Sequence, residues 1–372
     1  MEILVSFIIP FIVLLTVVVF IHEYGHYYYA KKFGVGVTDF SIGFGREIFG
    51  FNDKSGTRWK FCAIPLGGYV KFFGDRNVFS QAEQNELLKK YNKEDQKKLF
   101  VVKPLYQRSL IVAAGPFANF LLAIFIFAFI YMFAGKDFTP AQIQEVQLES
   151  PAFTAGIKTG DIIKSINKKE VNSIMEVSAF INSSLSKIIT IDVLRSDKQL
   201  TFNVEPKVIK SEDSLGNITN KKVIGIKIAP INNEINRQRL GPATALVYAV
   251  KETWFVISAS WNFVISMFQG TGDTTQLGGP IKIAKITGQV AKLGFVAFLS
   301  IMAYISISLG FINLLPIPML DGGHLMFYAF EKVLGRPLTQ KTQEGFFRIG
   351  LFLLLSLMFF TTFNDLKDLG LF

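Results

Sequence analysis

Four long apolar segments constrain the fold of this chain more than any other feature of its sequence. Each has close to the ~20 residues that cross the hydrocarbon core of a bilayer as a helix. Half of the 372 residues are hydrophobic, which is too many for an ordinary soluble protein. We therefore predict a polytopic α-helical membrane protein with about four transmembrane helices, at residues 3–20, 109–133, 295–315 and 347–363.

The first segment is expected to be a retained helix rather than a cleaved signal peptide. Only Met1 and Glu2 precede the apolar run, so a basic n-region is missing, and no small-x-small cleavage site follows. The predicted organisation begins with a first transmembrane helix that carries a metal motif (1–30), a cytoplasmic loop (31–108) and a second transmembrane helix (109–135). An inserted extracytoplasmic domain (136–235) and an interfacial helix with its linker (240–290) follow. The third transmembrane helix (291–324) and the fourth (345–364) complete the prediction.

The apolar stretch Ala245–Phe268 differs from the other four segments, because it contains charged and indole side chains: Lys251, Glu252, Trp254 and Trp261. This mixture is typical of an amphipathic helix at the membrane interface. A fifth membrane-spanning helix is the competing interpretation.

The loop after the first segment has two parts of different character. Residues 34–74 are rich in glycine and β-forming residues, which predicts short hairpins rather than helix. Their apolarity indicates that these hairpins dip into the membrane or line a cavity. Residues 80–100 are charged with a helical pattern, and we expect a solvated helix there.

A polar module separates the second and third segments. Short apolar runs with turn signals between them predict five strands, at Ala141–Leu148, Asp161–Asn167, Ile188–Leu194, Leu200–Val204 and Val223–Ile228. One helix is expected between them, near Met175–Asn182. The module is therefore predicted to be a compact α+β domain.

Basic residues predict how the chain lies in the membrane. They flank the first loop and fill the short loop between the third and fourth segments: Lys31, Lys32, Lys103, Arg108, Lys332, Arg336 and Lys341. Both loops should face the cytoplasm, which leaves the polar module outside. The net charge of +10 fits loops that face anionic lipid, so the bilayer is an expected partner. No basic block lies beside stacking aromatic residues on a polar segment, so we do not expect nucleic acid as a partner.

One motif in the first segment carries the chemistry, His22-Glu23-Tyr24-Gly25-His26. The two histidines are four residues apart, so on a helix both imidazoles lie on one face and can share one Zn²⁺. Glu23 beside them can accept a proton from the metal-bound water. Two histidines hydrogen-bonded within a helix bundle are the competing interpretation, but such groups are costly in an apolar segment unless they are functional.

A third zinc ligand must come from elsewhere in the chain. A single cysteine, Cys62, excludes a thiolate cluster, and His324 is the one other histidine. Asp321 and His324 are both candidates for this third ligand. They follow the third apolar segment, whose helix cannot continue through Pro316 and Pro318. An N-cap for the helix that follows is the structural alternative for Asp321.

Further motifs recur in order along almost the whole chain. They are Ser41-Ile42-Gly43-Phe44-Gly45, Pro65-Leu66-Gly67-Gly68-Tyr69-Val70-Lys71, Ala114-Gly115-Pro116-Phe117-Ala118-Asn119-Phe120, Leu277-Gly278-Gly279-Pro280-Ile281 and the stretch from Asn313 to His324. Together with the histidine motif, they make the sequence resemble the site-2 protease family (M50), and within it the bacterial regulator-of-sigma-E intramembrane proteases.

The resemblance implies that His22, His26 and Asp321 bind zinc and that Glu23 is the general base. It also implies that His324 is not a zinc ligand and instead packs in the core or contacts the ligands from behind.

The resemblance also implies that Asn313 lines the active site and positions the substrate or its oxyanion. A polar contact at the helix break is the competing interpretation. Relatives often carry a second asparagine where this chain has Ser308. A role of Ser308 in substrate binding is therefore open.

The polar module resembles the core of a PDZ domain over residues 150–167. This implies one inserted PDZ-like domain whose groove takes peptide C-termini or extended segments as an added strand. Larger members of the family carry two such domains in tandem, whereas one fits here.

A substrate helix must unwind before it is cut, because its carbonyl groups are hydrogen-bonded within the helix. The glycine-rich hairpins offer an edge strand to hold it extended, with Trp59–Ile64 and Gly68–Phe72 as candidates. We expect substrate contacts at Gly43, Gly45, Gly67 and Gly68. A loop that merely seals the site is the competing interpretation.

Together with the metal motif, the resemblance implies a zinc endopeptidase of the bacterial inner membrane. Its expected substrates are single-span proteins already cut on the outer side, such as anti-sigma factors or signal-peptide remnants. A non-catalytic membrane protein that binds peptides and holds a structural metal is the alternative function.

Overall fold

The structure is a computed structural model and describes residues 4–74, 88–212, 218–231, 234–272, 274 and 277–368. The chain forms two compact units. The first comprises residues 1–126 and 279–372, and the second comprises residues 127–278.

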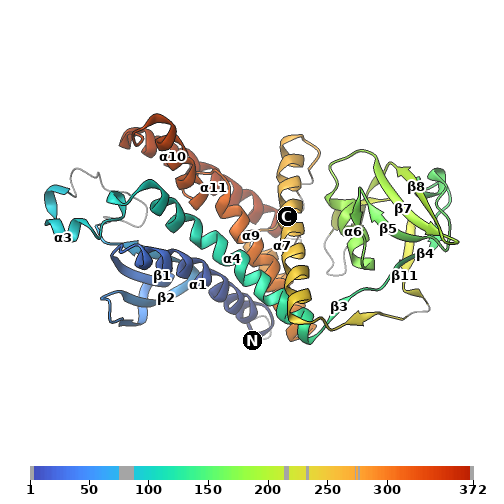
Figure 1. The fold of residues 1–372 in the computed structure, drawn as a ribbon, viewed down its shortest axis with the longest axis horizontal. Helices are drawn as coiled ribbons and strands as arrows, with labels where there is room; N and C mark the ends of the chain where they lie inside the picture. Colours follow the sequence, from blue (N-terminus) through green and yellow to red (C-terminus); the bar gives the residue numbers. More distant parts are fainter. Residues whose placement is uncertain are drawn as a thin grey trace. The chain divides into compact units, whose positions relative to one another are not determined.

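Long helices dominate the first unit (Figure 1). They are α1 (Ile9–Lys32), which a short π-helix at Leu4–Ile8 precedes, α4 (Leu105–Phe133), α9 (Phe295–Leu314) and α11 (Gln340–Asp368). All four are long and apolar enough to cross a membrane. The prediction of four transmembrane helices is thereby confirmed. The first, second and fourth helices extend beyond the apolar runs that predicted them.

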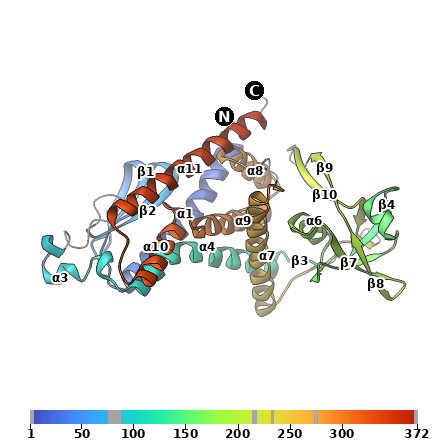
Figure 2. The ribbon, with the colours of Figure 1, turned by 90° about the horizontal axis from the view of Figure 1, so that it is seen from above.

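A bent hairpin packs against α1 (Figures 1 and 2). It consists of β1 (Val37–Asn52) and β2 (Arg58–Phe72). Because both strands bend, residues 39–42 of β1 pair with residues 58–61 on one side and residues 68–71 on the other. Residues 58–61 pair in turn with residues 49–52. The predicted hairpin region is thus a small folded-over sheet, with residues 68–72 at one edge.

Two further helices complete the transmembrane unit, α8 (Pro280–Lys292) and α10 (Asp321–Leu334). The buried carboxylate of Asp365 on α11 accepts hydrogen bonds from the backbone N–H groups of Gly279, Ile281 and Lys282. A side chain on one helix therefore satisfies the first N–H groups of another.

Short helical segments follow the hairpin in the part of the first loop that the structure describes. They include residues 88–90, α3 (Lys93–Gln96), with Asn92 as its N-cap, and a 3-10 turn at Phe100–Val102. The solvated helix predicted over residues 80–100 falls partly on residues 80–87, which lie outside the described residues.

The second unit contains an antiparallel sheet with the strand order β11-β4-β5-β7-β8, where β6 also pairs with β5. The strands are β4 (Ala141–Val146), β5 (Ile162–Ile166), β6 (Lys169–Glu170), β7 (Ile189–Arg195), β8 (Lys198–Val204) and β11 (Ile226–Ala229). Two helices accompany the sheet, α5 (Pro151–Ala155) and α6 (Ile174–Ser183). The five predicted strands and the predicted helix therefore all form, which confirms an inserted α+β domain.

Alternating aliphatic side chains make the core of this domain. Ile143, Ile163, Ile166, Ile189 and Ile191 are almost completely buried in it. Asp161 is also buried, where the Arg195 guanidinium donates to both of its carboxylate oxygens and the Lys158 N–H to one of them.

The remaining elements of the second unit are two small strand pairs and one long helix. The strands are β9 (Lys207–Glu212), β10 (Ile218–Val223), β3 (Lys136–Asp137) and β12 (Arg237–Gln238). The helix is α7 (Pro242–Phe268), which packs on α6 through a contact between the rings of Phe180 and Phe255. α7 is not among the four helices apolar enough to span a membrane, and its interfacial position stays a prediction.

Candidate metal centre

Three side chains from two distant segments converge in the first unit. His22 and His26 lie one turn apart on α1, and Asp321 begins α10. Nε2 of His22 is 3.3 Å from Nε2 of His26, and Oδ2 of Asp321 is 3.2 Å from the first and 3.5 Å from the second. Ligands about 2.0–2.1 Å from a tetrahedral zinc ion lie ~3.4 Å apart. The spacing therefore fits three zinc ligands.

Burial supports the same interpretation. His22 and His26 are 7% and 9% exposed. Oδ2 of Asp321 is buried without a hydrogen-bond partner. A buried carboxylate oxygen is costly unless a cation or a donor compensates it. These residues therefore suit a divalent metal, and among the described residues they are the cluster of His, Cys, Asp and Glu that can hold one.

A break between two helices, α9 and α10, places Asp321. The helix α9 ends at Leu314, and Met319 has a φ of 88°, which a side-chain-bearing residue rarely adopts. The first turn of α10 then lies directly against this break, since a Cβ on Gly322 would lie 2.2 Å from the carbonyl oxygen of Leu315. The N-cap of α10 is Leu320, and Asp321 is already the first residue of the helix, so the interpretation of Asp321 as an N-cap is wrong.

His324 does not join the metal cluster. Its ring packs against the rings of Phe327 and Phe347. Of the two candidates for a third ligand, the structure brings Asp321 to the histidines.

Close contacts between α1 and α4 shape the space around the ligands. A Cβ on Gly25 would lie 2.4 Å from the carbonyl oxygen of Ala114, and one on Gly115 would lie 2.2 Å from Nε2 of His26. The two glycines therefore let the helices approach and leave room for the imidazole.

Both histidines are also held from behind. Nδ1 of His26 lies 2.9 Å from the carbonyl oxygen of Ile111, and Nδ1 of His22 lies 3.2 Å from Nδ2 of Asn119. Sequence reasoning missed Asn119 as a site residue. The available signal was a polar amide within an apolar segment, although only the fold shows what this amide touches.

Glu23 lies beside the ligands and against the hairpin. A Cβ on Gly68 would lie 3.0 Å from Cγ of Glu23, and the backbone of Val70 forms a hydrogen bond with the Glu23 carboxylate. The edge segment of β2 therefore passes directly over the candidate base.

Asn313 lies at the site and Ser308 is occupied elsewhere. Nδ2 of Asn313 is 3.5 Å from Nε2 of His22. The hydroxyl of Ser308 donates to the carbonyl oxygen of Tyr304 in its own helix.

The four glycines expected at the substrate have two different positions. Gly43, Gly45 and Gly67 have φ values of 87°, 85° and 142° and lie where the register of the hairpin shifts. Gly68 is the one of the four whose nearest neighbours include the side chain of Glu23.

The two candidate edge segments are also distinguished. Trp59 pairs with both Phe40 and Phe51, and Phe61 pairs with both Ile42 and Phe49. Trp59–Ile64 as an edge strand is therefore wrong over residues 59–61, because the fold-over of the hairpin covers both sides. Gly68–Phe72 pairs with β1 on one side and with no strand on the other within the described residues.

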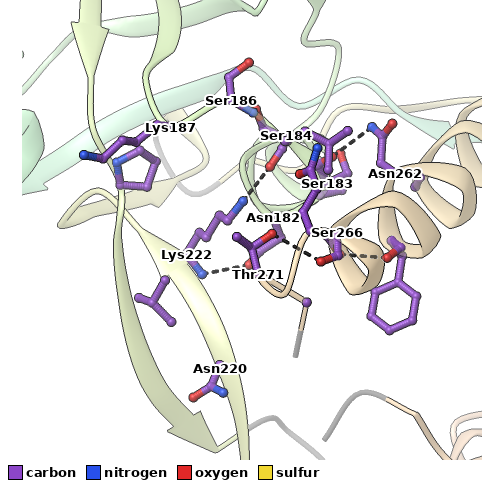
Figure 3. A pocket seen from close by; sticks show the side chains of 18 of the residues that line it. Asn182, Ser183, Ser184, Ser186, Lys187, Asn220, Lys222, Asn262, Ser266 and Thr271 are labelled. Carbon is purple, nitrogen blue, oxygen red and sulfur yellow. Dashed lines mark hydrogen bonds between the residues drawn. The ribbon is translucent and has the colours of Figure 1, made fainter. Parts of the chain in front are cut away.

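The second unit has a cavity of its own, with a volume of about 1070 Å³ (Figure 3). Side chains at the end of α6, on β10 and on α7 line it, including Asn182, Lys222, Asn262 and Ser266. It contains none of the predicted metal or catalytic residues.

Comparison with known proteins gives a family match and close relatives. The model of peptidase family M50 matches residues 10–357. A Mesorhizobium japonicum protein named "Putative zinc metalloprotease mll0638" is 42% identical over 363 residues, which cover 96% of this chain and 98% of that protein. Metalloprotease MmpA of Caulobacter vibrioides is 33% identical over 386 residues, which cover 98% of this chain and 96% of that protein.

One solved structure shows a partial likeness. It is the PDZ domain of an SdrC-like protein from Listeria monocytogenes, with 21% identity over 24% of this chain and 85% of that chain. The TM-score is 0.19, which does not establish a shared fold.

Proposed function

Because this chain belongs to peptidase family M50 and is a zinc metalloprotease with several membrane-spanning helices, we propose that it cuts its substrates within the membrane. The observation that carries the proposal is the position of the ligands. His22 and His26 lie in a helix long and apolar enough to span the bilayer, and Asp321 meets them from another segment. Peptide bonds near this centre belong to transmembrane segments.

Each residue of the centre has a distinct task. His22, His26 and Asp321 hold the metal. Bound zinc supplies a Lewis acid that activates water and polarises the scissile carbonyl group. Glu23, next to the ligands, accepts a proton from the attacking water and delivers it to the leaving amine. Asn313 carries an amide close to His22 and can donate a hydrogen bond to the developing oxyanion.

The substrate is held as an added strand on residues 68–72. A transmembrane helix hides its carbonyl groups in its own hydrogen bonds, so it must be extended before attack. The outer edge of Gly68–Phe72 offers backbone groups for this purpose, and the same segment touches Glu23. This contact favours a substrate clamp over a loop that merely seals the site.

We further propose the topology and the class of substrate. The enzyme lies in the inner membrane of a bacterium, with the 136–235 domain outside. It acts on single-span proteins after a first cut on the outer side, such as anti-sigma factors or signal-peptide remnants. The domain binds peptide C-termini or extended segments along β11, which is an edge strand of its sheet.

The test compares the full-length protein with two variants, co-expressed with a truncated anti-sigma factor. Glu23→Gln should abolish cleavage while the purified protein keeps its zinc, because the amide cannot accept the proton. Glu145→Gln removes an exposed carboxylate from β4 and serves as the matched control, with cleavage unchanged. Chelation should abolish cleavage by the wild type.

Cleavage by zinc-loaded Glu23→Gln protein would remove Glu23 as the base. If the zinc-loaded wild type binds this substrate and a signal-peptide remnant but cleaves neither, the result would favour the alternative function, a non-catalytic protein that binds peptides.

A further inference from the structure

We infer that Asn119 is a positioning residue that holds His22 in the tautomer that can bind zinc. The inference rests on the metal site proposed above and adds a residue to it. Asn119 lies on α4 and is completely buried, with its amide against the face of His22 that points away from Asp321.

The chemistry of imidazole sets the requirement. A neutral histidine has one ring proton, so a ring that binds metal through Nε2 carries that proton on Nδ1. The Nδ1–H group then needs a hydrogen-bond acceptor, which commonly also fixes the orientation of the ring. His26 meets the requirement with the carbonyl oxygen of Ile111, at 2.9 Å.

For His22 the group opposite Nδ1 is the side-chain amide of Asn119, at 3.2 Å. Oδ1 is the only atom of that side chain able to accept a hydrogen bond, and it is buried without a partner. A half-turn of the amide exchanges Oδ1 with Nδ2 and brings the acceptor to Nδ1–H. Oδ1 of Asn119 then accepts a hydrogen bond from Nδ1–H of His22, so that each group supplies the partner the other lacks.

The opposite arrangement is incompatible with the metal. If Nδ2 donated to Nδ1, the ring proton would be on Nε2 and would point at Asp321. Nε2 would then have no lone pair for zinc. The amide of Asn119 thus decides whether His22 is a ligand or a hydrogen-bond donor.

A second contact fixes the place of Asn119. The hydroxyl of Ser306 on α9 donates to the backbone carbonyl oxygen of Asn119, at 2.9 Å. Ser306 is also completely buried. This pair joins α4 to α9 without using the Asn119 side chain, so Ser306 provides a control for the packing of the same region.

The experiment measures zinc affinity in full-length protein purified in detergent, by competition with a chromophoric chelator. Asn119→Leu keeps the size of the side chain but removes the acceptor, and it should weaken zinc binding by about 10–100-fold. Asn119→Asp keeps an acceptor but cannot donate when ionised, and it should bind zinc at least as tightly as the wild type. Ser306→Ala should bind zinc like the wild type.

Folding is checked separately by thermal unfolding of the metal-free proteins. Asn119→Ser covers the case in which aspartate prevents folding, because it keeps an uncharged acceptor, and its loss of affinity should be smaller than that of Asn119→Leu. Equal losses in the Leu variant and in the folded acceptor-bearing variants would overturn the inference, and so would an unchanged affinity in Asn119→Leu. Failure of the site itself has another signature, since His22→Ala would then keep its zinc.

Discussion

Gly68 and Glu23 are in such close contact that a methyl group on the glycine would lie 3.0 Å from Cγ of the glutamate. The same methyl group would also lie 2.7 Å from the carbonyl oxygen of Ser41 on the paired strand. The edge of the hairpin therefore lies so close to the candidate base that no side chain fits between them.

Gly68→Ala should lower the rate of cleavage by about 100-fold, since the added methyl group displaces either Glu23 or the edge strand from its working position. Zinc content should not change, because the ligands are untouched. Gly345→Ala, on α11, has nothing within 4 Å of its added methyl group and is the matched control. A Gly68→Ala enzyme with normal turnover would show that the close contact has no catalytic importance.

Asp365→Ala should loosen the start of α8. The carboxylate accepts three backbone N–H groups there, and losing a cap of this kind costs about 1–2 kcal/mol. Hydrogen–deuterium exchange should rise at residues 279–284, whereas Asp365→Asn should show a smaller rise because it keeps one acceptor oxygen. Lys367→Ala, on the exposed side of the same helix, should leave exchange unchanged. Unchanged exchange in Asp365→Ala would refute the cap.

The Asp161–Arg195 pair should make the α+β domain sensitive to acid. Burial by itself raises the pKa of Asp161, but the hydrogen bonds from Arg195 and from the Lys158 N–H outweigh it, so the folded-state pKa lies below the ordinary value. The stabilisation is therefore complete above about pH 4, the unfolded pKa, and is lost as the pH falls through the folded pKa.

Asp161→Asn tests this link in the full-length protein. It should cost about 2–3 kcal/mol at neutral pH, as hydrogen bonds to a charged group are lost, and hydrogen exchange in β5 and β7 should rise. Below pH 4 the difference from the wild type should shrink. Asp197→Asn, in the exposed turn before β8, is the control. A difference that stays constant down to pH 2 would contradict the titration.

Met319→Gly should raise thermal stability by about 1 kcal/mol, because glycine adopts the positive φ of this position without strain. Met319→Val should have the opposite effect, since a branched side chain fits that conformation poorly. The valine variant should also bind zinc less tightly, because the break at Met319 places Asp321. Thermal unfolding and chelator competition together measure both effects, and equal behaviour of the two variants would count against strain at this position.

The sequence predicts much of this molecule because its elements follow local rules. Apolar length alone predicted α1, α4, α9 and α11, and alternating aliphatic residues predicted the strands of the α+β domain. The spacing of His22 and His26 gave their shared helix face.

Other features depend on contacts that no local pattern contains. The composition of residues 59–61 does not reveal whether a strand pairs with them on one side or on both, so they were predicted to form an edge strand. Only the bend of β1 brings a second strand segment to their other side. Asn119 likewise gains a role only when α4 lies against α1, and Asp365 only when α11 reaches the start of α8. Asp321 was one of two candidates until the break at Met319 turned it towards the histidines.

The ligand set also has a mechanical consequence. Residues 26 and 321 lie near opposite ends of the chain, so a zinc ion bound to both would act as a cross-link that closes one very long loop. Metal bound only by the folded chain adds its binding free energy to stability. The ion would thus tie α1 to the start of α10, and depletion of zinc would lower the free energy of unfolding of this bundle.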